Sequence, residues 1–333
     1  MFAARDTNHT ESTERAMTSE TADSRQVGLV GTGLVGTSFA YALIIRRLAS
    51  RLVLVDVNHE KALGEVMDFE HGLSFARPMK IEVGTYDDLA GCRIVVIAAG
   101  TGQRPGESRL DLLGRNAAIF RDIVPRIVKA NPGVILLIAT NPVDILTHIA
   151  LEVSGLPASR VIGSGTILDT SRFRFLLGQY YGVDTQSVHA YIIGEHGDSE
   201  IPVWSLANIG GVRLQEFAPL KNRRYDQKDM DDIFVRVRDA AYEIIKRKGA
   251  TYYAIGLGLV SIVEAILGDY RRVLPVSTLM TGAHGVHDMC LSLPSVVGRQ
   301  GIEEVLALNL SNDEAEGFRR SAEKLQETFR LLA

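Results

Sequence analysis

The chain has 333 residues, of which 46% are hydrophobic and 23% charged, and its formal net charge is −4 at pH 7. This length suits two domains of ordinary size, and this balance is typical of a globular protein with a large core. A net charge of −4 argues against a strongly basic surface, so we expect neither nucleic acid nor a membrane among the partners. The two cysteines, Cys92 and Cys290, suit a reducing compartment, and no apolar run approaches membrane length, which together predict a cytoplasmic protein.

The beginning of the chain is polar and rich in Thr, Ser and Glu. It has no hydrophobic periodicity, so residues 1–25 are predicted to form a disordered tail. Its acidic residues argue against an organellar transit peptide, and the missing apolar stretch argues against a secretory signal.

Residues 26–163 are predicted to form a doubly wound α/β domain of the Rossmann type. Short runs of Val, Ile and Leu that are typical of buried strands occupy residues 27–30, 52–55, 94–99 and 134–139. Helical patterns lie between them, at residues 34–48 and 116–130. Such strands alternating with helices indicate a parallel sheet covered on both faces, with right-handed crossovers.

The pattern changes after residue 163, because charged helices become more frequent and the strict alternation is lost. Residues 164–333 are therefore predicted to form an α+β substrate domain. Within it, apolar spacing predicts one helix over residues 230–245, with its apolar stripe in the core. A strongly apolar helix is predicted over residues 253–267.

The first predicted strand is followed by Gly31, Gly33 and Gly36, in the pattern G-x-G-x-x-G that opens a helix. The first glycine permits a tight turn, the second lets the backbone approach a pyrophosphate, and the third allows close contact between helix and strand. The helix start also offers unpaired N–H groups to phosphates. A plain glycine turn is the alternative interpretation.

Asp56 ends the next predicted strand. A carboxylate at this position accepts hydrogen bonds from the ribose hydroxyls of the adenosine and repels a 2′-phosphate, which predicts NAD over NADP as the cofactor. An ordinary strand-end turn residue is the alternative for Asp56.

Four further segments read GQRPGESR at residues 102–109, ATNPVD at 139–144, LDTSRFR at 168–174 and GEHGDSE at 194–200. Their sequence, order and spacing resemble the L-lactate/L-malate dehydrogenase family, and its lactate branch in particular. The resemblance extends from Val27 to the C-terminus. It implies reversible hydride transfer between NADH and pyruvate, giving (S)-lactate, in a homotetramer.

Reduction of a 2-oxo acid needs a proton for the carbonyl oxygen and a cation for the carboxylate. His196 is the candidate proton donor and acceptor, because imidazole titrates near neutral pH. The resemblance assigns Asp169 as the acid that orients His196, and Arg172, three residues further along the same helix face, as the cation that holds the substrate carboxylate. The alternatives are a surface-turn histidine and a structural salt bridge.

Segment 102–109 looks like the mobile lid of the family. The resemblance implies that Arg109 brings positive charge to the substrate carbonyl, and that Gln103 faces the C3 group of the substrate. Malate-type members carry arginine at the position of Gln103, and a neutral glutamine cannot pair with a second carboxylate, so pyruvate is favoured over oxaloacetate. Thr251 matches a small residue on the other side of this pocket. Malate or another 2-hydroxy acid remains the alternative substrate, and an NAD-binding protein without catalysis is the rival from another class.

The resemblance implies further contacts to the cofactor and to an effector. The additional cofactor residues are Val35, Tyr86, Gly100, Thr140, Asn141, Ser164 and Ile255, and Asn141 also contacts the substrate. Arg174 and His189 match positions that bind fructose 1,6-bisphosphate across a two-fold axis in many bacterial members. Their alternatives are a helix-surface charge and a strand-end residue. The scattered histidines predict no metal site.

Overall fold

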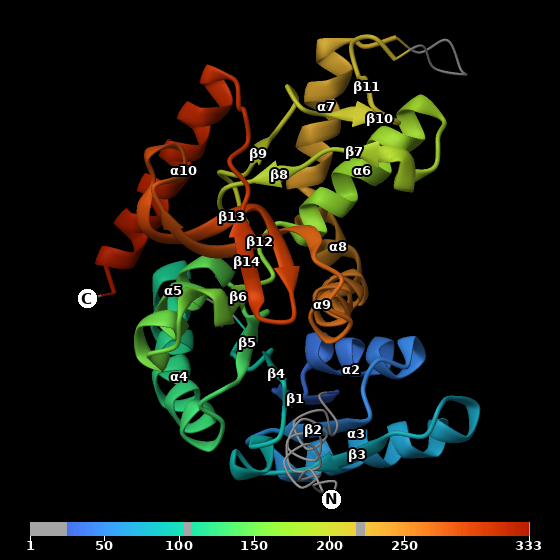
Figure 1. Cartoon of the computed structure of the whole chain (residues 1–333), viewed down its shortest axis with the longest axis vertical. Helices are drawn as coiled ribbons and strands as arrows, with labels where there is room; N and C mark the ends of the chain where they lie inside the picture. The colour runs from blue at the N-terminus through green and yellow to red at the C-terminus, as the bar shows by residue number, and fades with distance from the viewer. Residues whose placement is uncertain (1–24, 103–107, 218–223, 333) are drawn as a thin grey trace, which may run out of the picture.

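The computed structural model describes residues 25–102, 108–217 and 224–332 (Figure 1). The strands are β1 (Gln26–Val30), β2 (Arg51–Val55), β3 (Lys80–Val83), β4 (Ile94–Ile97), β5 (Ile135–Ile138), β6 (Val161–Gly163), β7 (Val188–His189), β8 (Ile192–Ile193), β9 (Ile201–Pro202), β10 (Asn208–Ile209), β11 (Val212–Arg213), β12 (Arg272–Thr281), β13 (His287–Gly298) and β14 (Gly301–Val305). The α-helices are α2 (Leu34–Arg46), α3 (His59–Gly72), α4 (Arg109–Ala130), α5 (Val143–Ser154), α6 (Ile167–Tyr181), α7 (Gln227–Arg238), α8 (Ala240–Lys248), α9 (Tyr253–Leu267) and α10 (Asn312–Arg330). The predicted tail lies outside these described residues, except for Arg25.

A parallel sheet in the order β3-β2-β1-β4-β5-β6 forms the N-terminal half, which confirms the predicted doubly wound fold. The strand order reverses between β1 and β4. In open α/β sheets, ligands bind outside the carboxyl ends of the strands at such a reversal. The site is therefore expected where β1 and β4 end.

The C-terminal half adds the antiparallel strands β12, β13 and β14 to the same sheet, next to β6. The junction is the pairing of Ser277 with Gly163. The result is one mixed sheet of nine strands, to which both halves of the chain contribute strands. Two small sheets, β11-β10-β7 and β8-β9, lie outside it.

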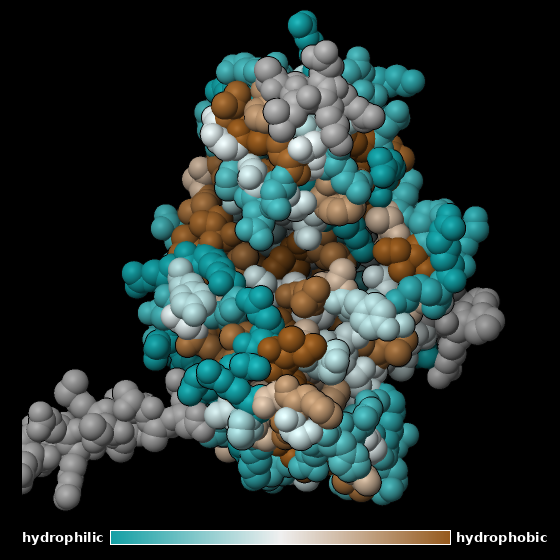
Figure 2. Space-filling view, turned by 90° about the vertical axis from the view of Figure 1, so that its right-hand side faces the viewer, coloured by the Kyte–Doolittle hydropathy of each residue, from teal (hydrophilic) through white to brown (hydrophobic). Residues whose placement is uncertain are grey.

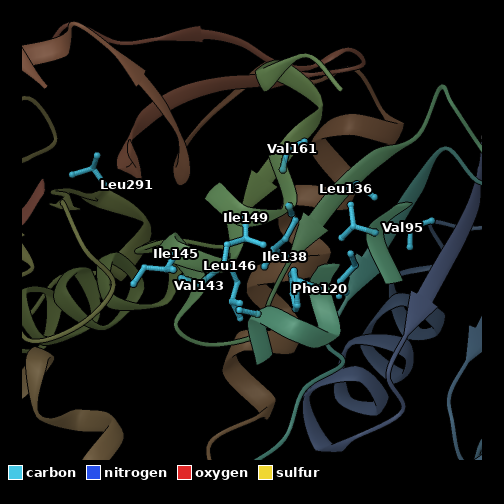
Figure 3. Close-up of a cluster of buried hydrophobic side chains, with 14 of the residues drawn as sticks. Val95, Phe120, Leu136, Ile138, Val143, Ile145, Leu146, Ile149, Val161 and Leu291 are labelled. Atoms are coloured by element: carbon cyan, nitrogen blue, oxygen red, sulfur yellow. The ribbon is translucent and has the colours of Figure 1, made fainter. Parts of the chain in front are cut away.

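Both faces of the parallel sheet are buried, as the continuous apolar runs predict. Val95 and Leu136 point to one face, which α4 and α5 cover (Figure 3). Val96 and Leu137 point to the other face, where α2 and α9 pack. This alternation follows from the two-residue period of a strand.

Helix α9 coincides with the predicted helix at residues 253–267. It packs against α2, which lies about 200 residues earlier in the sequence (Figure 1). Gly256 permits this approach, because a Cβ atom there would lie 2.9 Å from the backbone carbon of Ser38. Among the described residues, no helix is both long and apolar enough to cross a membrane.

Two predicted helices differ from the structure. Helix α4 begins at Arg109 rather than at residue 116, because Ser108 and Asp111 form a capping box. The single helix predicted over residues 230–245 is interrupted at Asp239, where α7 ends and α8 follows. Met230 of α7 is fully buried, whereas Ile245 of α8 is 47% exposed. Apolar periodicity indicates that a helix has an apolar stripe, but it does not show whether other elements of the fold bury that stripe.

Candidate active site

The glycine loop between β1 and α2 leaves room for a phosphate. Gly31 has φ +98°, and a Cβ atom there would lie 2.5 Å from the backbone nitrogen of Ala99. Gly36 packs against the carbonyl oxygen of Gly31, whereas a Cβ atom at Gly33 would meet no atom of the described residues within 4 Å. Gly33 is also the N-cap of α2, whose first turn carries no acidic residue. An anion can therefore reach the N–H groups of this helix start.

Asp56 ends β2 beside this loop. Its Oδ2 atom accepts hydrogen bonds from the backbone nitrogen and the hydroxyl of Thr32, at 2.6 and 2.9 Å, and its Oδ1 atom accepts one from the nitrogen of Asn58 at 2.8 Å. Burial acts to raise the pKa of Asp56, but these hydrogen bonds together outweigh burial and lower it. The group is therefore a carboxylate at neutral pH, as a partner for ribose hydroxyls should be.

A pocket of ≈ 560 Å³ opens next to Asp56. Tyr86 lines it, with the guanidinium of Arg126 lying 4.2 Å from the centre of its ring. Val55 and Ile119 contribute apolar wall. Apolar walls with a carboxylate at the strand end suit the adenosine end of a dinucleotide, and the glycine loop suits its pyrophosphate, so the residues present fit NAD.

The loops after β4 and β5 bring Gly100, Thr140 and Asn141 together. The hydroxyl of Thr140 donates to the carbonyl of Ala99 at 2.8 Å. Asn116 of α4 links the two loops, because it accepts from the nitrogen of Thr101 and donates to the carbonyl of Asn141. These predicted cofactor residues therefore lie along the carboxyl edge of the sheet.

Four other residues that were predicted to contact the cofactor or the substrate lie on separate parts of the fold. Ser164 is buried directly after β6, and its nitrogen donates to the carbonyl of Ile138. Val35 of α2 and Ile255 of α9 are half-buried and pack against the same apolar cluster. Thr251 is half-buried just before α9.

The structure brings His196, Asp169 and Arg172 into direct contact. The Nδ1 atom of His196 lies 2.5 Å from Oδ2 of Asp169, and a terminal nitrogen of Arg172 donates to Oδ1 of Asp169 at 2.9 Å. The side chain of Asp169 is 3% exposed, that of Arg172 14% and that of His196 24%. The acid is thus enclosed, while the imidazole and the guanidinium remain partly accessible.

The charges of this cluster set its protonation. Burial lowers the pKa of His196, but the charge and hydrogen bond of Asp169 outweigh burial and raise it to about 9. Burial raises the pKa of Asp169, yet His196 and Arg172 together lower it. Because Nδ1 faces Asp169, a protonated imidazole has its second proton on Nε2, where a substrate can receive it.

Asp144 was missed as a site residue by sequence reasoning, although it belongs to the segment at residues 139–144. It is 1% exposed in the first turn of α5, and its Oδ2 atom accepts from the backbone nitrogen of His196 at 2.7 Å. Burial raises its pKa to about 6. Asp144 thereby fixes the His196 loop next to Asn141 and the end of β5, so the cluster borders the dinucleotide crevice.

Glu200 was also missed. It is 6% exposed, and ligand atoms of Glu200, His196 and Asp169 all lie within 4.8 Å of one another. Three such groups can hold a metal ion in principle. Burial and the charge of Asp169 raise the pKa of Glu200 to about 9. The guanidinium of Arg172 already pairs with Asp169, which opposes a divalent cation here.

Gln103 lies outside the described residues. Arg109 begins α4, and its side chain also lies outside the described part of the chain. The predicted lid chemistry therefore stays a prediction.

The two predicted effector residues lie close together. The Nε atom of Arg174, on α6, donates to the carbonyl of Ala190 at 2.8 Å, and its guanidinium lies 4.8 Å from the ring centre of Tyr191. His189, directly before Ala190, ends β7 and is exposed. Arg174 also lines a pocket of ≈ 380 Å³ between α6 and α9.

The fold and this site define a dinucleotide-binding protein whose second half supplies a paired histidine and aspartate. Comparison with known families is consistent with that class. Residues 25–163 match the family described as the lactate/malate dehydrogenase NAD binding domain, and residues 166–331 match the lactate/malate dehydrogenase alpha/beta C-terminal domain. The chain therefore belongs to the lactate/malate dehydrogenase family.

Individual relatives agree with this assignment. The chain is 49% identical to the L-lactate dehydrogenase of Priestia megaterium over 309 residues, covering 92% of this chain and 96% of the relative. It is 51% identical to that of Bacillus caldolyticus, covering 90% and 95%. A crystal structure of the minor L-lactate dehydrogenase from Enterococcus mundtii, in a ligand-bound form, matches with a TM-score of 0.89 and 43% identity, covering 93% of this chain and 99% of that one.

Proposed function

We propose that this protein is an NAD-dependent L-lactate dehydrogenase that interconverts pyruvate and (S)-lactate. The observation that carries this proposal is the contact of His196, Asp169 and Arg172 at the edge of the dinucleotide crevice. The relatives described above, which are named for this activity, support it.

The reaction needs three functions from the protein. Bound NADH supplies a hydride to C2 of the 2-oxo acid. Arg172 holds the substrate carboxylate, since a guanidinium has five N–H donors and spends one of them on Asp169. His196 then gives its Nε2 proton to the carbonyl oxygen as C2 is reduced, which produces the hydroxyl of lactate, and it recovers this proton in the reverse direction.

The supporting residues act through position and charge. Asp169 fixes the imidazole orientation and stabilises the protonated form. Arg109 stabilises the negative charge that develops on the carbonyl oxygen. Gln103 and Thr251 leave a neutral space that suits the methyl group of pyruvate, whereas the second carboxylate of oxaloacetate would lie there unpaired.

The proposal extends to organisation and control. Residues 26–163 serve as the NAD-binding domain and residues 164–333 as the catalytic domain. Arg174 and His189 bind fructose 1,6-bisphosphate between subunits of a homotetramer. Exposed apolar side chains on α2 and α9, such as Ile45 at 57% and Leu257 at 60%, support an assembly, and Figure 2 shows apolar side chains gathered over the middle of one face.

The decisive experiment measures NADH oxidation by absorbance, with pyruvate and oxaloacetate as competing substrates. We expect pyruvate to have the higher kcat/KM. A preference for oxaloacetate would support the malate alternative, and NADH binding without turnover of either acid would support a non-catalytic protein. His196→Gln is the matched variant, which should bind NADH but lose turnover by roughly 10²-fold or more.

A further inference from the structure

Glu200 is a buried carboxyl group that the proposed reaction does not use. It follows the loop of His196, and its backbone nitrogen donates to the carbonyl of Gly197. Its side chain is enclosed, and the Oε1 atom is buried without a hydrogen-bond partner among the described residues. Burying an unpaired carboxylate is costly, whereas a protonated carboxyl group is tolerated far better.

Charged groups from three parts of the fold act on Glu200. Asp169 and Arg172 face it from α6, His196 from its own loop and Arg238 from the end of α7. Ligand atoms of Glu200, Asp169 and His196 fall within 4.8 Å of one another. Glu200 therefore shares one electrostatic environment with the proton donor.

The protonation of Glu200 determines the charge that a substrate meets. Arg238 is paired with Asp239, and the three groups in direct contact are Asp169, Arg172 and His196. With Asp169 negative and the other two positive, these three carry one positive charge in excess if Glu200 is neutral. That excess matches the single carboxylate of a 2-oxo acid. An ionised Glu200 would cancel the excess and would also place a second negative charge beside Asp169.

We propose that Glu200 is a positioning residue that keeps its proton in the working enzyme, and that its ionisation in alkaline solution closes the site to anionic substrate. This inference rests on the proposed function for its substrate. Burial, and then the charge of Asp169, raise the pKa of Glu200 to about 9, close to the value of His196. In this proposal the loss of either proton closes the site, so kcat/KM depends on two ionisations. The two protons leave in successive steps, because the protonated imidazole stabilises an ionised Glu200.

The pH dependence of kcat/KM for pyruvate tests this count of protons, because kcat/KM reports the ionisations of the enzyme before it binds the substrate. For the wild type we expect the alkaline fall to steepen to about a hundredfold per pH unit, as two groups must hold protons. Glu200→Gln and Glu200→Met cannot ionise at this position, so either variant should fall only about tenfold per unit. Asp198→Asn is the control, because Asp198 is an exposed acid of the same loop and its removal should leave the steep fall intact.

Infrared difference spectra across the same pH range test the protonation without any turnover. We expect the carbonyl band of a protonated carboxyl group to disappear as the pH rises in the wild type, and to be missing from both variants. A tenfold fall per unit in the wild type, an unchanged steep fall in a folded variant, or a band that persists in both variants would overturn the proposal. If pyruvate is not turned over at all, the proposed function fails, while the infrared band still decides whether Glu200 holds a proton.

Discussion

The backbone nitrogen of Glu195 donates a hydrogen bond to the hydroxyl of Ser321 at 2.8 Å. Ser321 is fully buried on α10, more than a hundred residues along the chain, and its hydroxyl also contacts that of Ser199 at 3.0 Å. The loop that carries His196 is therefore held from two sides, by α10 through Ser321 and by α5 through Asp144. Both attachments hold backbone nitrogens of the loop and not the imidazole ring itself.

Ser321→Ala should weaken this attachment. It leaves the nitrogen of Glu195 without its acceptor, which costs about 1–3 kcal/mol when such a group is buried. We expect a lower free energy of unfolding in urea together with a reduced kcat, because the proton donor is held less firmly. Thr328→Ala is the control, since the hydroxyl of Thr328 is exposed on the same helix. Equal losses from both substitutions would contradict this role of Ser321.

Asp169→Asn should move the pH dependence of catalysis. Asp169 raises the pKa of His196 to about 9, whereas burial alone lowers it, so removing the charge should bring that pKa down toward or below its ordinary value near 6.5. Pyruvate reduction needs the protonated imidazole, so the alkaline fall of kcat/KM should begin at lower pH. At neutral pH we expect a loss of roughly 10²-fold or more. Lactate oxidation needs the neutral imidazole, so its acid limb should shift to lower pH as well, and an unshifted profile would be inconsistent with the pair.

The N-terminal half could be predicted from the sequence because its signals are local. Continuous apolar runs mark strands with two buried faces, and the glycine loop with Asp56 marks the crevice that the strand reversal creates. The joining of the two halves is not local. One sheet results from the pairing of Ser277 with Gly163, which no periodicity in either segment indicates.

The same distinction explains the candidate site. His196, Asp169 and Arg172 were found because their segments resemble a family, and the structure brings them into contact. Asp144 and Glu200 stand within two of the same segments, but their importance lies in burial and in distances across the fold. A sequence shows an acidic residue in a loop, whereas only tertiary packing shows that it is desolvated beside another charge.

Asp56→Ser should relax the choice of cofactor. It removes a carboxylate that repels a 2′-phosphate, and it also removes hydrogen bonds to ribose, each worth about 1.5–3 kcal/mol when the group is charged. We expect kcat/KM for NADPH relative to NADH to rise by roughly tenfold or more. Asp122→Asn serves as the control, because Asp122 is an exposed acid of the same pocket, paired with Arg126. An equal change in this control would show that general charge, rather than the position of Asp56, decides the preference.

Gln103→Arg should raise kcat/KM for oxaloacetate relative to pyruvate, by roughly 10²-fold, because a guanidinium can pair with the second carboxylate of the larger acid. Gln103→Met keeps this position neutral and should leave the ratio low. Steady-state kinetics with both acids measure the effect. If the arginine variant discriminates as the wild type does, then Gln103 does not face the C3 group of the substrate.

His189→Ala should abolish activation by fructose 1,6-bisphosphate. Arg174 is fixed by Ala190 and Tyr191, which directly follow His189 in the chain, so its guanidinium lies close to the segment that carries His189. Two such pairs facing each other across a two-fold axis repel when no ligand is present, and a bisphosphate removes this repulsion.

For the wild type we expect the effector to lower the KM for pyruvate, and pyruvate to tighten effector binding by the same factor, because coupling is reciprocal. High salt should weaken both effects, and His71→Ala, which removes an exposed histidine at the end of α3, should preserve them. Wild-type kinetics that do not respond to the sugar bisphosphate would mean that Arg174 and His189 serve the surface structure alone.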